Sequence, residues 1–327
     1  MAQTTSEEWD SHWSSTRRTV RPEVIDNFFE DYPTLEMHRR RGLVVTDQGG
    51  KEISVRLITS GNTAESFDKY DPLNKSPINP FESAHYKRRY YAAPIILSDT
   101  ENWENSGPEQ VFDELEHLGN VGMKSLLKTI NEDLLSAQSG KNILGYQDIM
   151  ATSTGATIGG INSSTTTAWE SQRDTTSTTF TTQTVTNIFD GFDLWEGVRD
   201  AIRTQGGRSQ QMVTTYSIVR AYREVLSSAG YARTVMGDGK GVGGQDNPPF
   251  YGAEVIADND CPALATYFPD TRHTKLNVLR QANFRKTPFT SLQPNGQLAQ
   301  LAYMVAAVQL TTDKREANGV ATALTGA

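Results

Sequence analysis

The chain has 327 residues, 36% of them hydrophobic, and carries a formal net charge of −8. This length exceeds what one simple core usually holds, so we expect two lobes. The hydrophobic share is low for a compact enzyme, which places much of the chain in extended or polar segments. The negative charge argues against nonspecific binding of nucleic acid through a broad basic face. A single cysteine, Cys261, excludes an intramolecular disulfide and any zinc site built on paired thiolates.

The chain begins with a polar segment, residues 1–21, that is rich in Ser, Thr and Arg and contains Trp9 and Trp13. This composition predicts an arm that is mobile in the free monomer, and the two tryptophans indicate that it docks on another surface. The acidic start lacks the apolar stretch of a signal peptide. No run approaches about 18 consecutive apolar residues, so we expect no contact with a membrane.

Two short helices are predicted next, one from near Pro22 and one from near Pro33 that ends at Gly42. Residues 43–59 then predict a strand, a turn and a second strand with alternating polarity. Residues 60–85 are polar, and a strand-like run at 86–97 follows them. A structureless loop of this length is unusual within a compact domain, so we predict a long hairpin arm that projects from the body.

A capping-box pattern at Ser106–Glu109 opens the longest helical pattern of the chain. About thirty residues in this pattern predict a rod of roughly 45 Å. Its apolar stripe consists of Val111, Leu115, Leu118, Leu126, Ile130 and Leu134. The following residues, 151–187, include many Ser and Thr and predict the β-rich loops of a second lobe. Two amphipathic helices are expected near 193–204 and 215–229. From Tyr251 onward, short strand-like segments separated by turns predict repeated returns to one sheet.

The sequence contains no convincing catalytic or ligand pattern. A Gly-x-Gly-x-x-Gly match at residues 239–244 is followed by Pro-Pro, which excludes the helix that a phosphate-binding loop requires. The five histidines lack the spacing of metal ligands. Cys261 has no basic neighbour that would lower its pKa, so we interpret it as a buried residue at a turn. We therefore expect no enzymatic activity, metal or cofactor.

Charged clusters of opposite sign are the strongest candidates for contacts. One basic cluster is Arg39, Arg40 and Arg41, and the other runs through Tyr86, Lys87, Arg88, Arg89, Tyr90 and Tyr91. The acidic residues are Glu101, Glu104, Glu109, Asp113 and Glu114. We interpret these clusters, together with Trp9 and Trp13, as contacts between subunits. Solvated faces are the first alternative, and binding of single-stranded nucleic acid is the second.

The order of these segments resembles that of tailed-bacteriophage major capsid proteins of the Hong Kong 97 fold. The resemblance rests on the hairpin 53–97, the helix 106–138 and the phrase T-I-G-G-I-N-S-S-T-T-T-A-W that ends at Trp169. It continues in G-A-E-V-I-A-D-N-D-C-P-A, in N-F-R-K-T-P-F and in the final strand-like run.

The resemblance implies an α+β fold with five parts. They are an N-terminal arm (1–42), a long β-hairpin called the E-loop (43–100), a P-domain with a spine helix (101–150), an A-domain (151–265) and a return to the P-domain sheet (266–327). It implies a structural protein of the virion capsid, assembled in the host cytoplasm. Copies would form the pentamers and hexamers of an icosahedral shell that encloses double-stranded DNA without sequence-specific contact.

The same resemblance implies a portal protein as a partner and decoration proteins as optional ones. Only about forty residues precede the hairpin, which leaves no room for the scaffolding segment that some members carry. A separate scaffolding protein, or none, is therefore expected. We can align no pair of residues with the lysine–asparagine cross-link of some members. Two alternatives are an encapsulin-like cellular compartment, which uses the same fold, and a β-rich receptor-binding protein of the virion.

Overall fold

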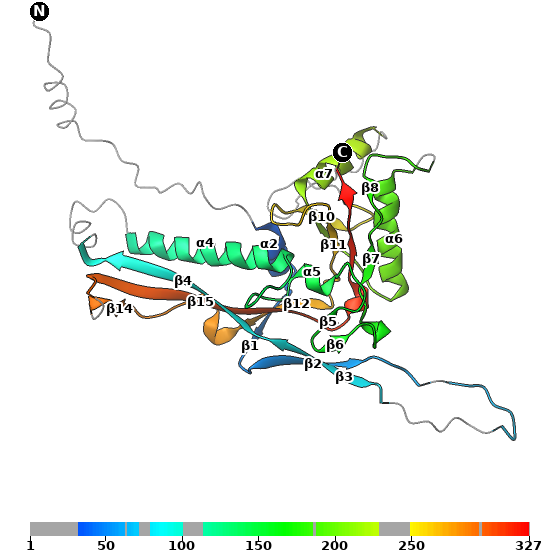
Figure 1. Ribbon diagram of the computed structural model, residues 1–327, viewed down its shortest axis with the longest axis horizontal. Coiled ribbons are helices and arrows are strands. Elements are labelled where there is room, and N and C mark those ends of the chain that lie inside the picture. Colours follow the sequence, from blue (N-terminus) through cyan, green and yellow to red (C-terminus); the bar gives the residue numbers. More distant parts are fainter. Residues whose placement is uncertain are drawn as a thin grey trace, which may run out of the picture.

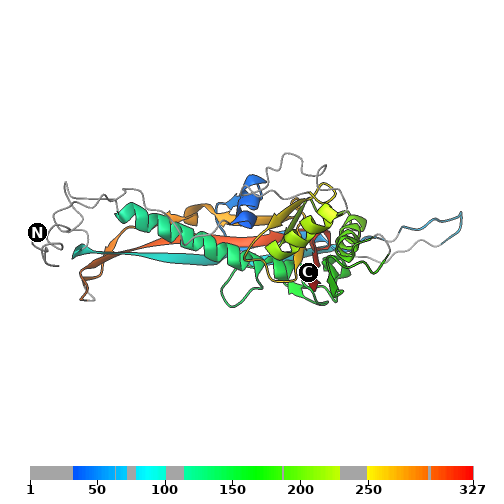
Figure 2. The ribbon, with the colours of Figure 1, turned by 90° about the horizontal axis from the view of Figure 1, so that it is seen from above.

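A computed structural model describes residues 32–62, 64–71, 79–100, 114–185, 188–228, 249–293 and 296–326. It shows two lobes and a projecting hairpin (Figures 1 and 2). The first lobe is an elongated limb in which a helix lies on a six-stranded sheet. The second lobe is built on a five-stranded sheet and two further helices. The α+β composition predicted from the sequence is confirmed.

The sheet of the first lobe is organised around one long strand, β15. It pairs antiparallel with four other strands, and β1 joins the sheet by pairing parallel with β12. The longest pairing, between β15 and β4, runs from Ala299 opposite Ser98 to Val308 opposite Arg89. The strands are β1 (Val44–Asp47), β4 (Arg89–Ser98), β12 (Thr274–Leu279), β13 (Arg285–Lys286), β14 (Thr290–Ser291) and β15 (Ala299–Thr312).

Helix α4 (Glu114–Leu135) lies along β4 and β15 (Figure 2). Its 22 residues give a length of about 33 Å. Leu126, Ile130 and Leu134 are buried in the core, and Leu118 packs partly buried against it, so this part of the predicted stripe is confirmed. The capping box, Val111 and the side chain of Leu115 lie outside the described part of the structure. Gly122 allows the close approach of helix and sheet, because an added Cβ would lie 3.3 Å from Ile95.

The sheet of the second lobe has the strand order β10–β9–β11–β16–β7. One face packs on the aromatic cluster of Phe180, Trp195, Tyr222 and Phe250, and the other face continues the core of the first lobe. The strands are β7 (Gln172–Asp174), β9 (Gln211–Thr214), β10 (Glu254–Ala257), β11 (Thr266–Phe268) and β16 (Gly319–Ala321). The two predicted helices are confirmed as α6 (Asp190–Thr204) and α7 (Tyr216–Ser228).

The remaining elements are short. Near the start of the described chain, helix α2 (Pro33–Arg40) ends before Gly42, as predicted, and Gly42 has a φ of +67°. The others are α5 (Tyr146–Ile149), β5 (Thr157–Ile158), β6 (Ile161–Asn162), β8 (Thr178–Thr179), β17 (Leu324–Thr325), and single turns of 3₁₀ helix at Thr167–Trp169, Arg280–Ala282 and Arg315–Ala317. None of the described helices is long and apolar enough to cross a membrane.

The predicted hairpin is present but shorter than expected. Strand β2 (Glu52–Ile58) pairs antiparallel with β3 (Phe81–Lys87), and the arm projects away from the body (Figure 1). At Arg88 the chain leaves the hairpin, and β4 joins the sheet of the first lobe instead. The reason is that alternate side chains of β4, such as Ile95, are buried on the α4 side of the sheet.

The end of the chain also differs from the prediction that residues 266–327 return to one sheet. Strands β12 to β15 do so, but β11 and β16 lie in the sheet of the second lobe. Strand β16 is a buried Gly-Val-Ala segment, too short to show an alternating pattern in the sequence. Gly319 is required there, because an added Cβ would lie 2.8 Å from Val198 and 2.9 Å from Ile202.

Candidate functional site

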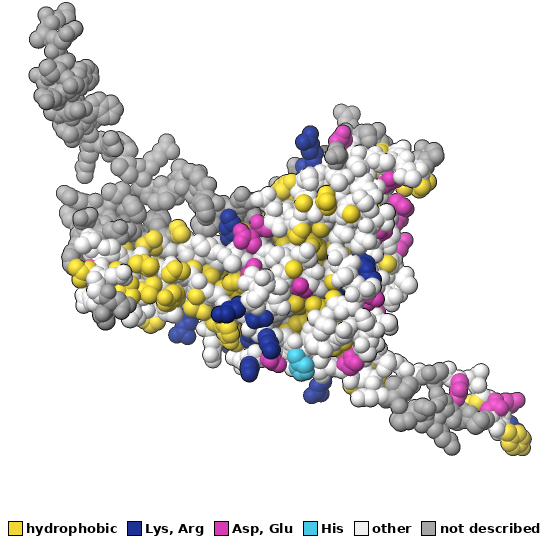
Figure 3. Space-filling view, in the orientation of Figure 1, with side chains coloured by type: hydrophobic (Ala, Val, Ile, Leu, Met, Phe, Trp, Pro, Cys, Tyr) yellow, Lys and Arg dark blue, Asp and Glu magenta, His cyan; other side chains and the backbone are white. Residues whose placement is uncertain are grey.

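The end of the hairpin arm exposes large apolar side chains. Ile58 and Phe81 close the pairing of β2 and β3 and are 74% and 67% exposed, while Phe67 and Tyr70 are 66% and 90% exposed. Hydrophobic side chains are visible at the far end of the arm (Figure 3). A group of this kind on a soluble chain usually marks a surface for association. The sequence of residues 60–85 indicates only a polar segment.

The base of the arm is held to the body by buried contacts. The Tyr86 hydroxyl donates a hydrogen bond of 2.7 Å to the main-chain oxygen of Thr312, and burial raises its pKa. The main-chain N–H of His85 donates to the oxygen of Gly159 at 2.8 Å. A Cβ at Gly159 would lie 2.8 Å from that of Ala84, so glycine permits this approach. These contacts fix the direction in which the arm leaves the body.

A second apolar surface lies on the sheet of the first lobe, on the face of β4 and β15 opposite α4. Successive side chains of a strand point to opposite faces, and partners opposite each other on antiparallel strands share a face. Ile96 faces Leu301, and Pro94 faces Tyr303. Ile96 and Tyr303 are exposed.

The first basic cluster is bound largely within its own chain. The guanidinium groups of Arg40 and Arg41 lie 2.5 Å and 2.9 Å from the two carboxylate oxygens of Glu254 at the start of β10. Burial alone would raise the pKa of Glu254, but the hydrogen bonds from both arginines outweigh it and lower the pKa. Arg39 is exposed beside them. Arg40 and Arg41 are thus paired with Glu254, and the predicted role between subunits stays a prediction for all three residues.

The second basic cluster alternates between the two faces of its strands. Tyr86, Arg88 and Tyr91 point inward; the Tyr91 hydroxyl donates to Asp133 at 2.6 Å and accepts from the main-chain N–H of Ile143 at 3.0 Å. These three side chains therefore anchor the chain itself, and their interpretation as contacts between subunits stays a prediction. By contrast, three neighbours stay accessible: Lys87 and Tyr90, which are exposed, and Arg89, which is partly so.

Several other candidates lie outside the described residues. They are Trp9, Trp13, Glu101, Glu104, Glu109 and Asp113. Glu114 begins α4, but its side chain is not described. The pairing of acidic and basic zones between subunits therefore stays a prediction.

Arg315, a buried arginine with several main-chain partners, was not identified from the sequence. The guanidinium of Arg315 is buried and donates hydrogen bonds to the main-chain oxygens of Ile149 (2.7 Å), Asp148 (3.1 Å) and Trp169 (3.1 Å). Burial is the main cause that lowers its pKa to about 10. Arg315 thus ties the segment after α4 to the turn between β15 and β16. Its neighbours, Thr-Thr-Asp-Lys-Arg-Glu, are typical of an exposed loop, so the sequence carried no signal for this role.

The described chain offers anchoring contacts rather than a constellation of reactive groups. Cys261 is buried as predicted, and burial raises the pKa of its thiol. Buried His38 shares a hydrogen bond of 2.6 Å with the Tyr146 hydroxyl. Within the described ranges, no group of three or more His, Cys, Asp or Glu could hold a metal ion. The glycine-rich segment 237–244 lies outside these ranges.

Comparison with known proteins identifies solved structures that share this fold. No protein-family model and no curated protein matches the chain. Among solved structures, a chain of the cyanophage A-1(L) capsid asymmetric unit matches with a TM-score of 0.72 and 14% identity over 98% of both chains. The capsid of the native GTA particle matches with a TM-score of 0.65 and 13% identity over 98% of this chain and 99% of that one. A protein of Mycobacterium phage Bobi matches with a TM-score of 0.62 and 10% identity over the whole of both chains. The chain therefore has the α+β fold of these phage capsid structures, the Hong Kong 97 fold.

Proposed function

We propose that the chain is the major capsid protein of a tailed bacteriophage. In this proposal, many copies assemble as pentamers and hexamers into an icosahedral shell around double-stranded DNA. The support is a fold shared over nearly the full length with capsid structures. The protein acts by association and catalyses no reaction, and its place is the virion capsid.

The observation that carries the assembly part of this proposal is the hairpin arm with its exposed apolar end. A lone two-stranded hairpin is marginally stable in water, and this one presents Phe67 and Tyr70 to solvent instead of its own core. Burial of a large apolar side chain contributes about 1.5–3 kcal/mol. The arm therefore gains most of its stabilisation by lying on another molecule.

The receiving surface in this proposal is the apolar face of β4 and β15 on a second copy. Ile96 and Tyr303 supply exposed apolar area there, and Tyr90 extends it toward the base of the arm. Lys87, exposed at the end of β3, would meet a carboxylate at the rim of the contact, although an exposed ion pair adds only about 0–1 kcal/mol. Each subunit would both give and receive one arm, so a closed shell sums many modest contacts.

We keep the predicted division of the chain with two changes. The arm proper consists of β2, β3 and the segment between them, and the last residues from β16 onward belong to the second lobe, the proposed A-domain. A portal protein and a separate scaffolding protein are the expected assembly partners, and decoration proteins are optional ones. The packaged DNA would lie against the shell without sequence-specific contact, as the net charge of −8 favours.

Electron microscopy of the purified protein, expressed with and without its neighbouring genes, tests this function. The expected result is closed shells with fivefold vertices, filled with DNA when the packaging genes are present. Shells that enclose a co-purified enzyme in place of DNA would identify a cellular compartment. A protein that stays monomeric under every condition would contradict the proposal.

A further inference from the structure

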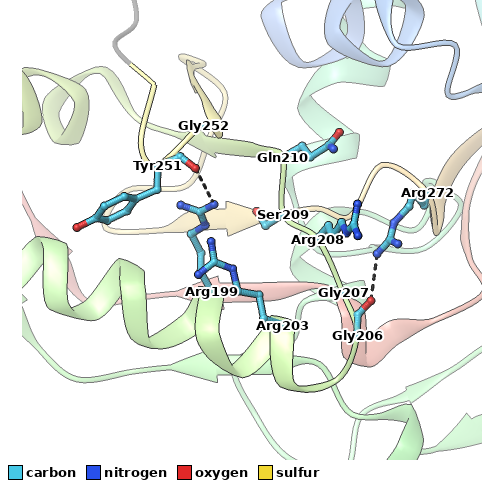
Figure 4. A pocket seen from close by; sticks show the side chains of 10 residues that line it. All are labelled: Arg199, Arg203, Gly206, Gly207, Arg208, Ser209, Gln210, Tyr251, Gly252 and Arg272. Atoms are coloured by element: carbon cyan, nitrogen blue, oxygen red, sulfur yellow. Dashed lines mark hydrogen bonds between the residues drawn. The ribbon is translucent and has the colours of Figure 1, made fainter. Parts of the chain in front are cut away.

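The second lobe contains a cavity of about 560 Å³ with a strongly basic lining. Four of its ten lining residues are arginines, and none is Asp or Glu. Arg199 and Arg203 reach it from α6, while Arg208 and Arg272 come from two loops beyond the end of that helix (Figure 4). This concentration of positive charge is unexpected in a chain with a net charge of −8.

The position of Arg199 is fixed by the protein itself. Its Nη1 donates 2.9 Å to the main-chain oxygen of Phe250, its Nη2 donates 3.3 Å to that of Tyr251, and its side chain lies over the Phe250 ring. The residue is buried, with 6% of its surface exposed. Burial lowers the pKa of Arg199, and the nearby charge of Arg203 lowers it further. The protein therefore holds two like charges close together.

Among the described residues, only part of this charge is paired directly with carboxylates. Arg272 pairs with the buried carboxylate of Asp270 at 2.7 Å, and Arg203 pairs with Asp200 at 3.1 Å. Neither Arg199 nor Arg208 has a carboxylate partner among the described residues. Among the described residues, ion pairs thus account for two of the four guanidinium groups, while Asp200 and Glu196 act on Arg199 through their charge alone.

We propose that this cavity binds a linear oligophosphate, an anion of the pyrophosphate or tripolyphosphate class. Figure 4 shows Arg199 and Arg203 on one side of the segment 206–209 and the side chains of Arg208 and Arg272 on the other. An anion with several charged groups along a chain carries one group for each pair. Guanidinium groups bind phosphate oxygens through paired hydrogen bonds. A single carboxylate would supply one charge where two guanidinium groups lack an ion-pair partner among the described residues, so an inserted Asp or Glu of another copy fits less well.

Glycines keep the backbone along this cavity accessible. Gly206 and Gly252 line it, and both have positive φ values, +75° and +80°. A Cβ added at Gly252 would have no other atom within 4 Å. A phosphate chain can therefore lie against the main chain between the two arginine pairs. This inference does not rest on the shell function, because the cavity is formed within one subunit.

Isothermal titration of the full-length protein with sodium tripolyphosphate, at constant ionic strength, tests the inference. We expect saturable binding with one site per chain. Arg208→Gln and Arg203→Gln should each weaken it by roughly tenfold or more, because each removes a charge-assisted hydrogen bond. Both residues are exposed, so the variants should keep the wild-type melting temperature. Arg280→Gln is the matched control, an exposed arginine in the first lobe, and should bind like wild type.

Competition with other anions distinguishes free oligophosphates from the phosphate groups of nucleic acid. Orthophosphate should bind more weakly than tripolyphosphate, since it reaches one arginine pair. Displacement of tripolyphosphate by a thymidine oligonucleotide would assign the site to the phosphates of nucleic acid, and failure to displace it would assign the site to free oligophosphates. Absence of tripolyphosphate binding, binding unchanged in Arg208→Gln, equal loss in Arg280→Gln, or equally tight binding of a tricarboxylate would overturn the proposal.

Discussion

The Arg88 guanidinium lies 2.9 Å from the carboxylate of Asp47, at the point where the hairpin arm joins the body. It also donates hydrogen bonds of 3.0 Å to the main-chain oxygens of Gly49 and Gly50. The side chain of Arg88 is 3% exposed and that of Asp47 is 26% exposed. One buried arginine thus joins the end of β1, the turn before β2 and the bend between β3 and β4.

Replacing Arg88 by alanine should therefore destabilise the subunit by about 2–4 kcal/mol, because the acceptors around a buried charge lose their donor. Lys87→Ala is the matched control: its side chain is adjacent but exposed, and its loss should change stability by less than about 0.5 kcal/mol. Urea denaturation of both variants measures the difference. Equal midpoints for the two would show that the contact with Asp47 does not stabilise the bend.

The packing of α4 on the sheet gives a second prediction. Leu126 is buried between α4 and the sheet, so Leu126→Ala should lower the free energy of unfolding by about 2–5 kcal/mol. Val121 on the same helix is 49% exposed, and Val121→Ala should cost less than about 1 kcal/mol. Thermal or urea melting of the unassembled subunit gives both values. A Leu126→Ala variant that melts like wild type would mean that the helix is not held by this stripe.

Stability should also fall as the pH drops below neutral, because of His38. Burial lowers the pKa of its imidazole from 6.5 to about 4. The unfolded chain therefore takes up a proton at higher pH than the folded one. The contribution of His38 to the free energy of unfolding is fully present only above pH 6.5 and is lost as the pH falls. Between pH 7 and pH 5 this difference amounts to roughly 2 kcal/mol.

Urea denaturation at both pH values, for wild type and His38→Gln, measures this contribution. The variant should lose less stability than wild type between pH 7 and pH 5. His85→Gln serves as the control, because His85 is an exposed histidine on the arm. If His38→Gln shows the same pH dependence as wild type, another group titrates in this range.

The elements that could be predicted from the sequence are those with a local pattern. The α4 stripe through Leu126 and Ile130 follows helical spacing, and Pro33 and Gly42 mark the ends of α2 by backbone preference. The hairpin was predictable because two alternating strands enclose a polar segment. The end of the hairpin at Lys87 was not predictable, because the residues that follow continue the same strand pattern. Only their pairing with β15 in the folded chain separates them from the hairpin.

The contacts that define the candidate surfaces depend on partners far away in the sequence. Arg40 and Arg41 meet Glu254, and Arg315 meets main-chain oxygens near Trp169. A run of basic residues has the same composition whether it is exposed or paired, so the sequence could not separate these cases. The cavity around Arg199 and Arg208 likewise forms only when α6, the turn at Tyr251 and Gly252, and the loop at Arg272 come together.

The central claim is that the hairpin arm serves assembly, and shortening the arm tests it most directly. Replacing residues 61–79 by a short Gly-Ser turn keeps every paired residue of β2 and β3. A full-length variant with Phe67→Ser and Tyr70→Ser tests the apolar end alone, and Val185→Ser, at an exposed valine in the second lobe, is its control.

Sedimentation velocity and electron microscopy of these variants, alongside thermal melting, give the decisive measurement. The account predicts that the shortened arm and the Phe67/Tyr70 double variant yield soluble subunits with wild-type melting and no closed shells, while Val185→Ser assembles normally. A shortened variant that still builds closed shells, or one that no longer folds, would contradict the account.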